Sequence, residues 1–477
     1  MKTAKGLSWS LLEVFFNKGI NFLVGIILAR ILSPSEFGLI GVLTIFISIL
    51  STLIESGFTT ALIRKISARS IDYNTVFYFN IVSSIFLYGT LYLLAPLISQ
   101  FFDDNNIILL LRTLGFVLIF SSFGIIQKTI LTKQLNFKIQ AKISIVSSII
   151  SGMLGVFLAI NNYGVWSLVI REISRQFLIS VFFWIFSNWR PAVEFSTKSL
   201  FSLFGFGSKI LFANLLESAY RNIYYTIIGK FFTISELGQY TRAEQFNSLF
   251  SNTLTSVIQR VSFPVFSQLQ NNDDKLKLYF KQAIQTAAIV TFPLMLGLIA
   301  VAEPLLLVLI GDKWHQAIIY LQIIAVGGAI YPMHALNIDI LLSKGRSDLF
   351  IKLEFFKKSL LIIPILLGAF ISIKFMLIGS VFVSYFGFYL NSFYSKMLIN
   401  YSAFYQFRDI SPIFLISVFV SFLIWCLTLF NFSSLTTLLL QIGSGITIYL
   451  IIFKLSNSPI IHSFKNILHY LSNNNYD

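Results

Sequence analysis

The chain has 477 residues, of which 56% are hydrophobic and only 12% are charged. Because a soluble domain carries roughly 25% charged residues, this composition excludes an ordinary soluble globular protein. The net charge of +15 is spread over short segments between apolar runs, which indicates membrane topology rather than a nucleic-acid patch. The single cysteine, Cys426, lies inside an apolar run, which excludes a disulfide framework and a cysteine-based metal site.

Apolar stretches of about 20 residues, the length of a membrane-spanning helix, recur along nearly the whole chain. They lack the strict alternation of barrel strands, so we predict an all-α polytopic membrane protein with about 14 transmembrane helices. The first six predicted spans are Leu11–Leu32, Phe37–Ser56, Val76–Ile98, Ile107–Ile126, Ala141–Ile160 and Val165–Phe186. The next six are Phe206–Lys230, Leu237–Phe263, Ala283–Ala302, Ala317–Leu341, Leu349–Ile373 and Phe375–Ile399, and Ile413–Phe432 and Leu435–Phe453 complete the set.

Basic residues predict the orientation of these spans. With both termini in the cytoplasm, most Lys and Arg residues fall in inside segments or on the helix ends beside them. The outside segments then keep only Arg30, Lys230, Lys313 and Lys374. The first ten residues read as a retained cytoplasmic start rather than a signal peptide. Residues 456–477 are predicted to form an amphipathic helix at the cytoplasmic interface.

An internal repeat relates the two blocks of six spans. The segment Ala29–Gly38 is echoed by Gly229–Gly238, in which a basic residue, a short turn and Ser-Glu-apolar-Gly recur. Six spans separate the copies, and six is even, so both halves enter the membrane in the same direction. We therefore predict a parallel repeat of two lobes, residues 1–198 and 199–400, with the substrate path between them. Residues 401–455 hold the last two spans.

Polar residues form a stripe along one face of four repeat-related spans. In the first span the stripe contains Asn17, Lys18, Asn21 and Gly25, and in the seventh it contains Asn214, Glu217, Arg221 and Tyr225. In the second span it contains Thr44, Ser48, Thr52 and Glu55, and in the eighth Arg242, Gln245, Ser248, Asn252, Thr255 and Gln259. Such faces predict a water-filled cavity lined by these four helices.

Charged residues inside membrane spans are costly and mark transport pathways by default. As cationic or polar residues that bind the substrate we predict Lys18, Asn21, Arg175, Arg221, Arg242 and Arg260, and as carboxylates for ion coupling Glu55, Glu217 and Asp339. Plainer interpretations remain open: Glu217 and Arg221 can neutralise each other at i, i+4, and Lys18 can extend to the interface. His334 belongs to either a packing network or a proton relay.

Signatures of enzymes are missing from the sequence. The 4 histidines have no metal-ligand spacing, and the chain contains neither a P-loop nor a dinucleotide-binding glycine pattern. We therefore predict a protein that is not an enzyme and that uses no metal and no cofactor.

Several short motifs along the chain carry a family resemblance. They are Ile26–Gly38, Ser56–Lys65, Gly164–Leu168, Trp189–Pro191, Gly238–Phe246, Gln259–Val265 and Gly345–Asp348. In these stretches the chain resembles the polysaccharide-exporter branch of the MOP flippase superfamily, and within it the group of colanic acid and teichuronic acid exporters. The resemblance covers nearly the whole chain.

The resemblance implies a V-shaped transporter of the bacterial inner membrane. Its substrate would be an oligosaccharide linked to undecaprenyl diphosphate, moved outward by alternating access for exopolysaccharide, capsule, teichuronic acid or O-antigen synthesis. A polysaccharide polymerase and a chain-length protein would be its partners. A cationic cavity suits such a substrate, since Arg forms bidentate bonds to phosphate oxygens.

Two other functions remain open at this point. A multidrug or cation antiporter of the same superfamily would need acidic rather than basic residues in its cavity. A membrane polysaccharide polymerase or glycosyltransferase would need a catalytic loop outside the membrane, and every predicted outside loop is short.

Overall fold

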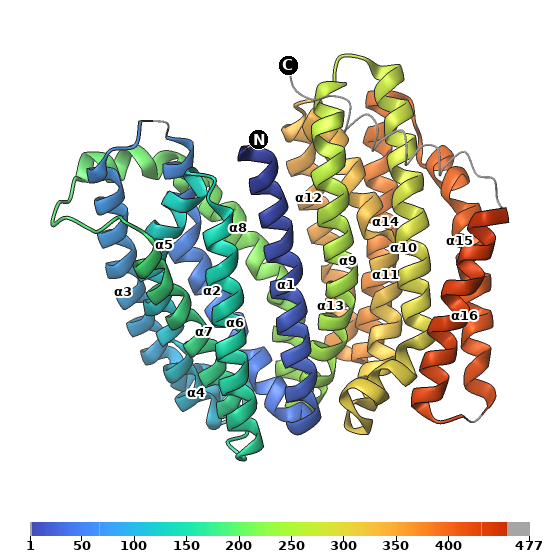
Figure 1. Cartoon of the computed structure of the whole chain (residues 1–477), viewed down its shortest axis with the longest axis horizontal. Coiled ribbons are helices and arrows are strands. Elements are labelled where there is room, and N and C mark those ends of the chain that lie inside the picture. The colour runs from blue at the N-terminus through green and yellow to red at the C-terminus, as the bar shows by residue number, and fades with distance from the viewer. Residues whose placement is uncertain (1, 66, 431, 456–477) are drawn as a thin grey trace. The chain divides into compact units, whose positions relative to one another are not determined.

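The computed structural model describes residues 2–65, 67–430 and 432–455, and this part of the chain is helical almost throughout and contains no strand (Figure 1). The first helices are α1 (Lys2–Ile31), α2 (Pro34–Arg64), α3 (Ser70–Phe102), α4 (Asn106–Leu114), α5 (Phe116–Lys133), α6 (Phe137–Ile160), α7 (Val165–Phe186) and α8 (Thr197–Phe231). They are followed by α9 (Ile234–Gln268), α10 (Asp273–Ile310), η1 (Asp312–Trp314), α11 (His315–Ser343), α12 (Ser347–Leu360), α13 (Ile362–Phe370), α14 (Ile373–Ile399), α15 (Ala403–Cys426), η2 (Leu427–Phe430) and α16 (Ser434–Leu455).

The predicted all-α membrane architecture is confirmed. Within the described residues, each predicted span falls largely on one helix or on two helices joined end to end. Nine helical stretches in the described residues are long and apolar enough to cross a membrane, and the bent helix α8 would be a tenth. Outside this set are α1 and α9, as well as α7, which carries Arg171, Glu172 and Arg175, and α12 and α13, which are individually too short. The count of fourteen crossings stays a prediction.

The two copies of the repeat start their helices with the same local structure. Before α2, the Glu36 N–H donates to Ser33 Oγ at 3.4 Å, and Glu36 Oε2 accepts from the Ser33 N–H at 2.6 Å. Before α9, Thr233 and Glu236 repeat this exchange at 3.2 and 3.0 Å. Such a capping box satisfies two N–H groups that a helix start leaves without partners. The motif found in the sequence thus forms the same turn geometry in both halves of the chain.

The starts of α2 and α9 also contact each other directly. A Cβ atom on Gly38 would lie 1.8 Å from the Ile234 carbonyl oxygen, and one on Gly238 would lie 1.8 Å from the Pro34 carbonyl oxygen. Both glycines occupy the same position of the repeat, so the contact is reciprocal, as in a two-fold interface. Only glycine allows the two backbones to approach this closely.

Helix α8 is bent by 54° between its parts Thr197–Gly205 and Gly207–Phe231. Close to the bend the backbone of α8 meets α2, since a Cβ atom on Gly57 would lie 2.5 Å from the Gly207 carbonyl oxygen. The first turn of α8 is held by the fully buried Asp72 of α3, which accepts from Ser199 Oγ at 2.5 Å. Asp72 also pairs with Lys65 Nζ at 2.8 Å. These contacts fix the beginning of α8 to the turn between α2 and α3.

Helix α11 is the centre of the second half of the chain, where it packs against both α10 and α14. A buried amide network joins it to α14 and α15. Asn337 and Gln406 exchange two hydrogen bonds of 3.0 Å, and Ser395 Oγ donates to Asn337 Oδ1 at 2.6 Å. Buried amides destabilise a bundle unless they are hydrogen-bonded, so this network fixes the relative positions of the three helices.

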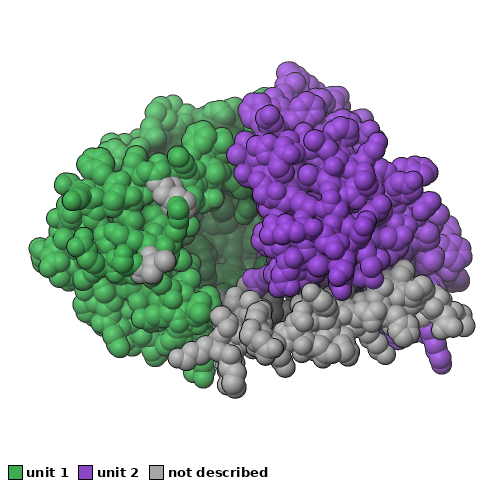
Figure 2. Space-filling model, turned by 90° about the horizontal axis from the view of Figure 1, so that it is seen from above, with its two compact units in different colours: residues 1–241 green, residues 242–477 purple. Residues whose placement is uncertain are grey.

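By their contacts, residues 1–241 and 242–477 form two compact units (Figure 2). The predicted lobes, residues 1–198 and 199–400, rest on the sequence repeat, and that division stays a prediction, as does the separate C-terminal part 401–455. The predicted interfacial tail, residues 456–477, lies outside the described residues.

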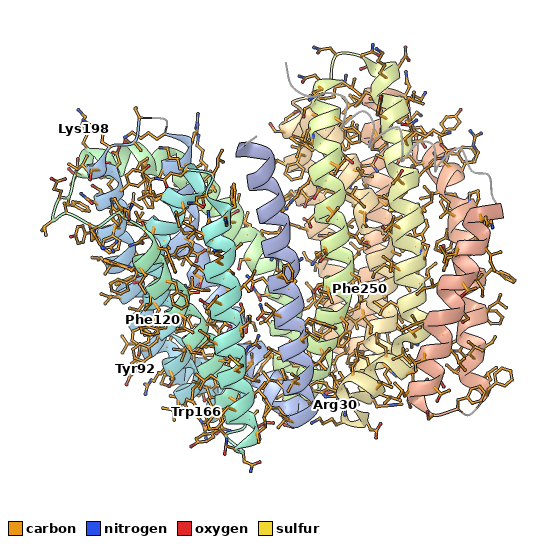
Figure 3. The ribbon with its side chains drawn as sticks, in the orientation of Figure 1. Arg30, Tyr92, Phe120, Trp166, Lys198 and Phe250 are labelled. Carbon is orange, nitrogen blue, oxygen red and sulfur yellow. The ribbon has the colours of Figure 1, made fainter. Side chains whose placement is uncertain are left out.

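The two ends of the first unit carry the residues that the topology assigns to opposite sides of the membrane. Lys198, predicted inside, lies at one end, and Arg30 and Trp166, on the predicted outer side, lie at the other (Figure 3). The helical arrangement therefore agrees with alternating crossings in this unit. The cytoplasmic side of this unit stays a prediction.

The orientation can be tested with single cysteines in a Cys426→Ser background. We expect an impermeant thiol reagent to label Asn162→Cys on intact cells and to leave Ser67→Cys unlabelled until the membrane is opened. Labelling of Ser67→Cys in intact cells, with Asn162→Cys protected, would reverse the predicted orientation.

The reciprocal glycine contact predicts equal sensitivity at its two positions. Gly38→Ala and Gly238→Ala should each lower the melting temperature in detergent, because overpacking of this kind costs about 1–3 kcal/mol. Gly89→Ala is the matched control, since a Cβ atom there would meet nothing within 4 Å. If all three variants melt like the parent protein, the backbones do not approach as described.

Candidate functional site

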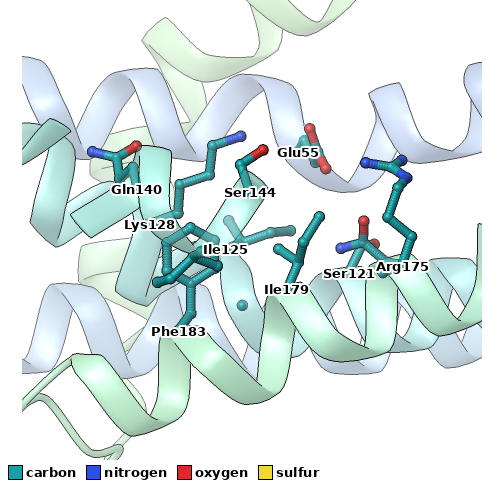
Figure 4. Close-up of a pocket in the computed structure, with 12 residues that line it drawn as sticks. Glu55, Ser121, Ile125, Lys128, Gln140, Ser144, Arg175, Ile179 and Phe183 are labelled. Atoms are coloured by element: carbon teal, nitrogen blue, oxygen red, sulfur yellow. The ribbon is translucent and has the colours of Figure 1, made fainter. Parts of the chain in front are cut away.

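A polar pocket of about 180 Å³ lies inside the first unit, between α2, α5, α6 and α7 (Figure 4). Its lining comprises Glu55, Ser121, Gly124, Ile125, Lys128, Gln140, Ile143, Ser144, Arg175, Gln176, Ile179 and Phe183. Lys128 lies near the end of α5 and Gln140 near the start of α6, so the pocket is next to the turn that the topology predicts to be cytoplasmic. The pocket combines charged groups, amides and hydroxyls within an otherwise apolar bundle.

Arg175 is held in the pocket wall by its neighbour on α7. Its Nη2 donates to Glu172 Oε1 at 2.5 Å and its Nε donates to Glu172 Oε2 at 3.2 Å. A bidentate pair of this kind fixes the plane of the guanidinium group. In Figure 4 the Glu55 carboxylate and the Ser144 hydroxyl lie between the ends of the Lys128 and Arg175 side chains. The lining therefore offers two cations and one carboxylate.

A chain of hydrogen bonds connects the pocket to α1. Asn17 contacts the pocket residue Ser144 and accepts from Ser148 Oγ at 2.7 Å, so α1 is attached to α6. Asn21 donates to the Asn17 carbonyl oxygen at 2.8 Å and accepts from Arg171 Nη2 at 2.6 Å. The polar stripe of the first predicted span thus contacts α6 and α7 of its own unit.

The structure brings only two of the predicted site residues, Glu55 and Arg175, into this pocket. Asn21 reaches it indirectly, through the hydrogen bonds of Asn17, and Lys18 is half-buried on α1. Arg221 and Glu217 form an ion pair of 3.7 Å with side chains that are 76% and 55% exposed. The other predicted residues belong to the second unit: Arg242 is half-buried, Arg260 is exposed and Asp339 is buried.

Sequence reasoning missed most of the pocket's polar wall. Lys128, Gln140, Ser144 and Gln176 are not among the residues predicted for the site. A signal was present, because Ser121, Gly124, Ile125 and Lys128 follow the spacing of one helical face.

The arrangement can bind an anionic group through charge-assisted hydrogen bonds. Lys128 and Arg175 carry positive charge, while the amides and hydroxyls of the lining can donate to oxygen atoms. Sites for drug-sized ligands occupy roughly 300–1,000 Å³, so this smaller pocket fits a phosphate group or one sugar rather than an oligosaccharide. Within the described residues, no group of three His, Cys, Asp or Glu residues could hold a metal ion.

Two solved membrane proteins share this fold. The lipid II flippase MurJ, in an inward closed conformation, matches with a TM-score of 0.75 at 16% identity, over 93% of this chain and 97% of that chain. An inward-facing multidrug resistance MATE transporter of the MOP superfamily matches with a TM-score of 0.62 at 16% identity, over 80% of this chain and 94% of that one. The chain therefore has the same helical fold as these two proteins.

A family model described as "Polysaccharide biosynthesis protein" matches residues 27–319, and the chain belongs to this family. One relative is the teichuronic acid biosynthesis protein TuaB of Bacillus subtilis (strain 168), 28% identical over 300 residues, which are 62% of each chain. Another is the succinoglycan biosynthesis transport protein ExoT of Rhizobium meliloti (strain 1021), 25% identical over 68% of this chain and 66% of ExoT. The matched part spans slightly less than two thirds of both relatives. The resemblance predicted from the motifs is confirmed.

The ion pair in the pocket wall predicts a non-additive response to substitution. Arg175→Gln should lower the melting temperature in detergent, because it leaves the half-buried Glu172 carboxylate without its partner. The double variant Glu172→Gln/Arg175→Gln should recover much of that loss. Equal melting of the single and double variants would show that the pair does not stabilise this helix.

Proposed function

We propose that this protein is a flippase that moves an oligosaccharide linked to undecaprenyl diphosphate across the bacterial cytoplasmic membrane by alternating access. The observation that carries the proposal is the cationic pocket, located inside a helical bundle that belongs to the polysaccharide biosynthesis family. The pathway it serves would be the synthesis of exopolysaccharide, capsule, teichuronic acid or O-antigen. A polysaccharide polymerase and a chain-length protein are its proposed partners.

In this proposal the pocket binds the phosphate end of the substrate. Arg175 is pre-oriented by Glu172, so little side-chain freedom is lost when its remaining N–H groups meet phosphate oxygens. Lys128 supplies a second positive charge from α5. Because the pocket is too small for the saccharide, the sugars would lie outside it, in the water-filled cavity that the polar stripes predict.

Further residues along the path are part of the proposal. Lys18, Asn21, Arg221, Arg242 and Arg260 would contact the substrate at other stages of the cycle. Glu55, Glu217 and Asp339 are the carboxylates available for coupling to an ion. Both termini would face the cytoplasm.

A cation antiporter is the nearest alternative, and one observation favours it, namely the Glu55 carboxylate in the pocket. Glu172 already pairs with Arg175, but the N–H groups of Lys128 and Arg175 in the lining outnumber the acceptors of this single carboxylate, so an anionic ligand fits it better. A polymerase or glycosyltransferase is less compatible with the described residues, in which the turns on the predicted outer side are only a few residues long. We therefore propose a transporter rather than an enzyme.

Binding of the lipid carrier alone tests this proposal without knowledge of the saccharide. Undecaprenyl diphosphate should raise the melting temperature of the purified protein, and uncharged undecaprenol should not. A ligand at 100 times its Kd adds about 2.7 kcal/mol of stability, which is a measurable shift.

Matched variants assign the effect to the pocket. The shift should be lost in Lys128→Gln and in Glu172→Gln/Arg175→Gln, and kept in Lys142→Gln, which removes an exposed cation of α6 outside the pocket. If undecaprenol produces the same shift, or if Lys142→Gln behaves like Lys128→Gln, the pocket does not recognise a diphosphate.

A further inference from the structure

The three carboxylates proposed for ion coupling have different surroundings. Glu217 pairs with Arg221 on the same helix, and both side chains are exposed. Glu55 lines the pocket that also contains Arg175 and Lys128. Asp339 is only 3% exposed and lies on α11, in a stretch long and apolar enough to cross a membrane. Only Asp339 combines full burial with a place away from the cationic pocket.

The contacts of Asp339 are few. Its Oδ1 accepts a hydrogen bond from Gln259 Nε2 of α9 at 3.0 Å, and its Oδ2 is buried without any hydrogen-bond partner. Within the described residues, no Lys, Arg or His lies within 4.0 Å of this carboxylate to form an ion pair. An ionised carboxylate in such a place has a large desolvation cost, and a group of this kind neutralises instead.

Several charged groups on and beside the neighbouring helices are paired with other residues or exposed. On α10, Lys281 pairs with Asp409 at 3.0 Å. Lys344, just after α11, pairs with Asp273, and Lys357 of α12 pairs with Glu354. Arg260 of α9, Lys352 of α12 and Lys396 of α14 are exposed.

His334, on α11 itself, lies within hydrogen-bond distance of two side chains of α14. Its Nδ1 is 3.2 Å from Asn391 Nδ2, and its Nε2 is 3.4 Å from Ser384 Oγ. The Lys357 side chain also approaches this ring beside Gly387. His334 is therefore bound within its own network and supplies no counter-charge to Asp339.

We propose that Asp339 is the proton-carrying group of the transport cycle, neutral in the state described here and ionised when another state exposes it to water. The inference rests on the proposed function, because it names the ion that drives it. In the neutral state Oδ2 carries the proton as an O–H group. One proton is taken from water on one side of the membrane and returned to water on the other, and no covalent bond of the protein changes otherwise.

A proton fits this site better than a metal cation. Gln259 presents an N–H group to the carboxylate, whereas a bound cation would need oxygen atoms directed at it. The described residues also contain no group of three His, Cys, Asp or Glu that could hold a metal. Asp339 lies four positions before the end of α11, about 6 Å along the helix axis, so a modest opening at that end would bring it to water.

Infrared spectroscopy tests the protonation state without any transport assay. The purified full-length protein at neutral pH should show the C=O stretching band of a protonated carboxylic acid, and Asp339→Asn should lose that band. Asp409→Asn, which removes a carboxylate paired with Lys281, should keep it. Absence of the band in the parent protein at neutral pH would overturn the proposal.

Proteoliposomes containing a pH-sensitive dye test the role in the cycle. Addition of undecaprenyl diphosphate should cause proton movement in the parent protein and none in Asp339→Asn, while the melting shift caused by this lipid is kept in both. If Asp339→Asn moves protons at the parental rate, the proposal is wrong even though the protein binds the lipid. If the parent protein shows no melting shift with the lipid, the proposed function itself fails, and the infrared result still decides the state of Asp339.

A second variant covers the case in which Asp339→Asn does not fold. The amide of Gln259 stabilises the ionised carboxylate by donating to it, so Gln259→Leu should move the disappearance of the infrared band to higher pH. An unchanged or lower transition pH would show that the band does not belong to Asp339 in this setting, and would overturn the proposal.

Discussion

The high cost of an unpaired charge in an apolar interior is the constraint on which this structure depends. It is met by pairing within a helix, as in Glu172 and Arg175, and by pairing between helices. Lys65 with Asp72 joins α2 to α3, and Lys281 with Asp409 joins α10 to α15. Charged residues with such partners belong to the architecture, and Arg175 is the one among them that also lines the pocket. The polar groups left over, in the pocket and at Asp339, are therefore the ones to which a transport role is assigned.

Features set by local sequence could be predicted, and features set by packing could not. Helix positions follow from apolar length, and the shared turn at Ser33 and Thr233 follows from a capping motif of four residues. The bend in α8 and the break between α12 and α13 were missed, because a hydropathy window averages over an interruption with apolar residues on both sides. Pro364 was a weak sign of the second break, since it lies in the first turn of α13, where proline is tolerated.

In the candidate site, too, the contacts that depend on packing between helices could not be predicted from the sequence. Periodicity identified Asn17 and Asn21 as one face of a helix, but it could not tell which neighbour that face meets, and in the structure it meets α6 and α7. Arg175 was selected as a charge inside a span, and the structure adds its pairing with Glu172. Lys128 was missed because a basic residue near a helix end usually indicates only which side of the membrane that end faces. Its position in the pocket depends on the packing of α5 against α7, which no single-helix pattern contains.

The two copies of the repeat share their backbone contacts and differ in their interior side chains. The caps at Ser33 and Thr233 and the contact between Gly38 and Gly238 are the same in both copies, since they concern backbone geometry. The side chains at equivalent interior positions differ: Asn21 accepts from an arginine of another helix, whereas Arg221 pairs within its own helix. Two copies of one backbone arrangement can differ in this way, because substitutions that leave each charge with a partner do not disturb the backbone contacts. Anion binding in one unit and proton carrying in the other would be such a division of roles.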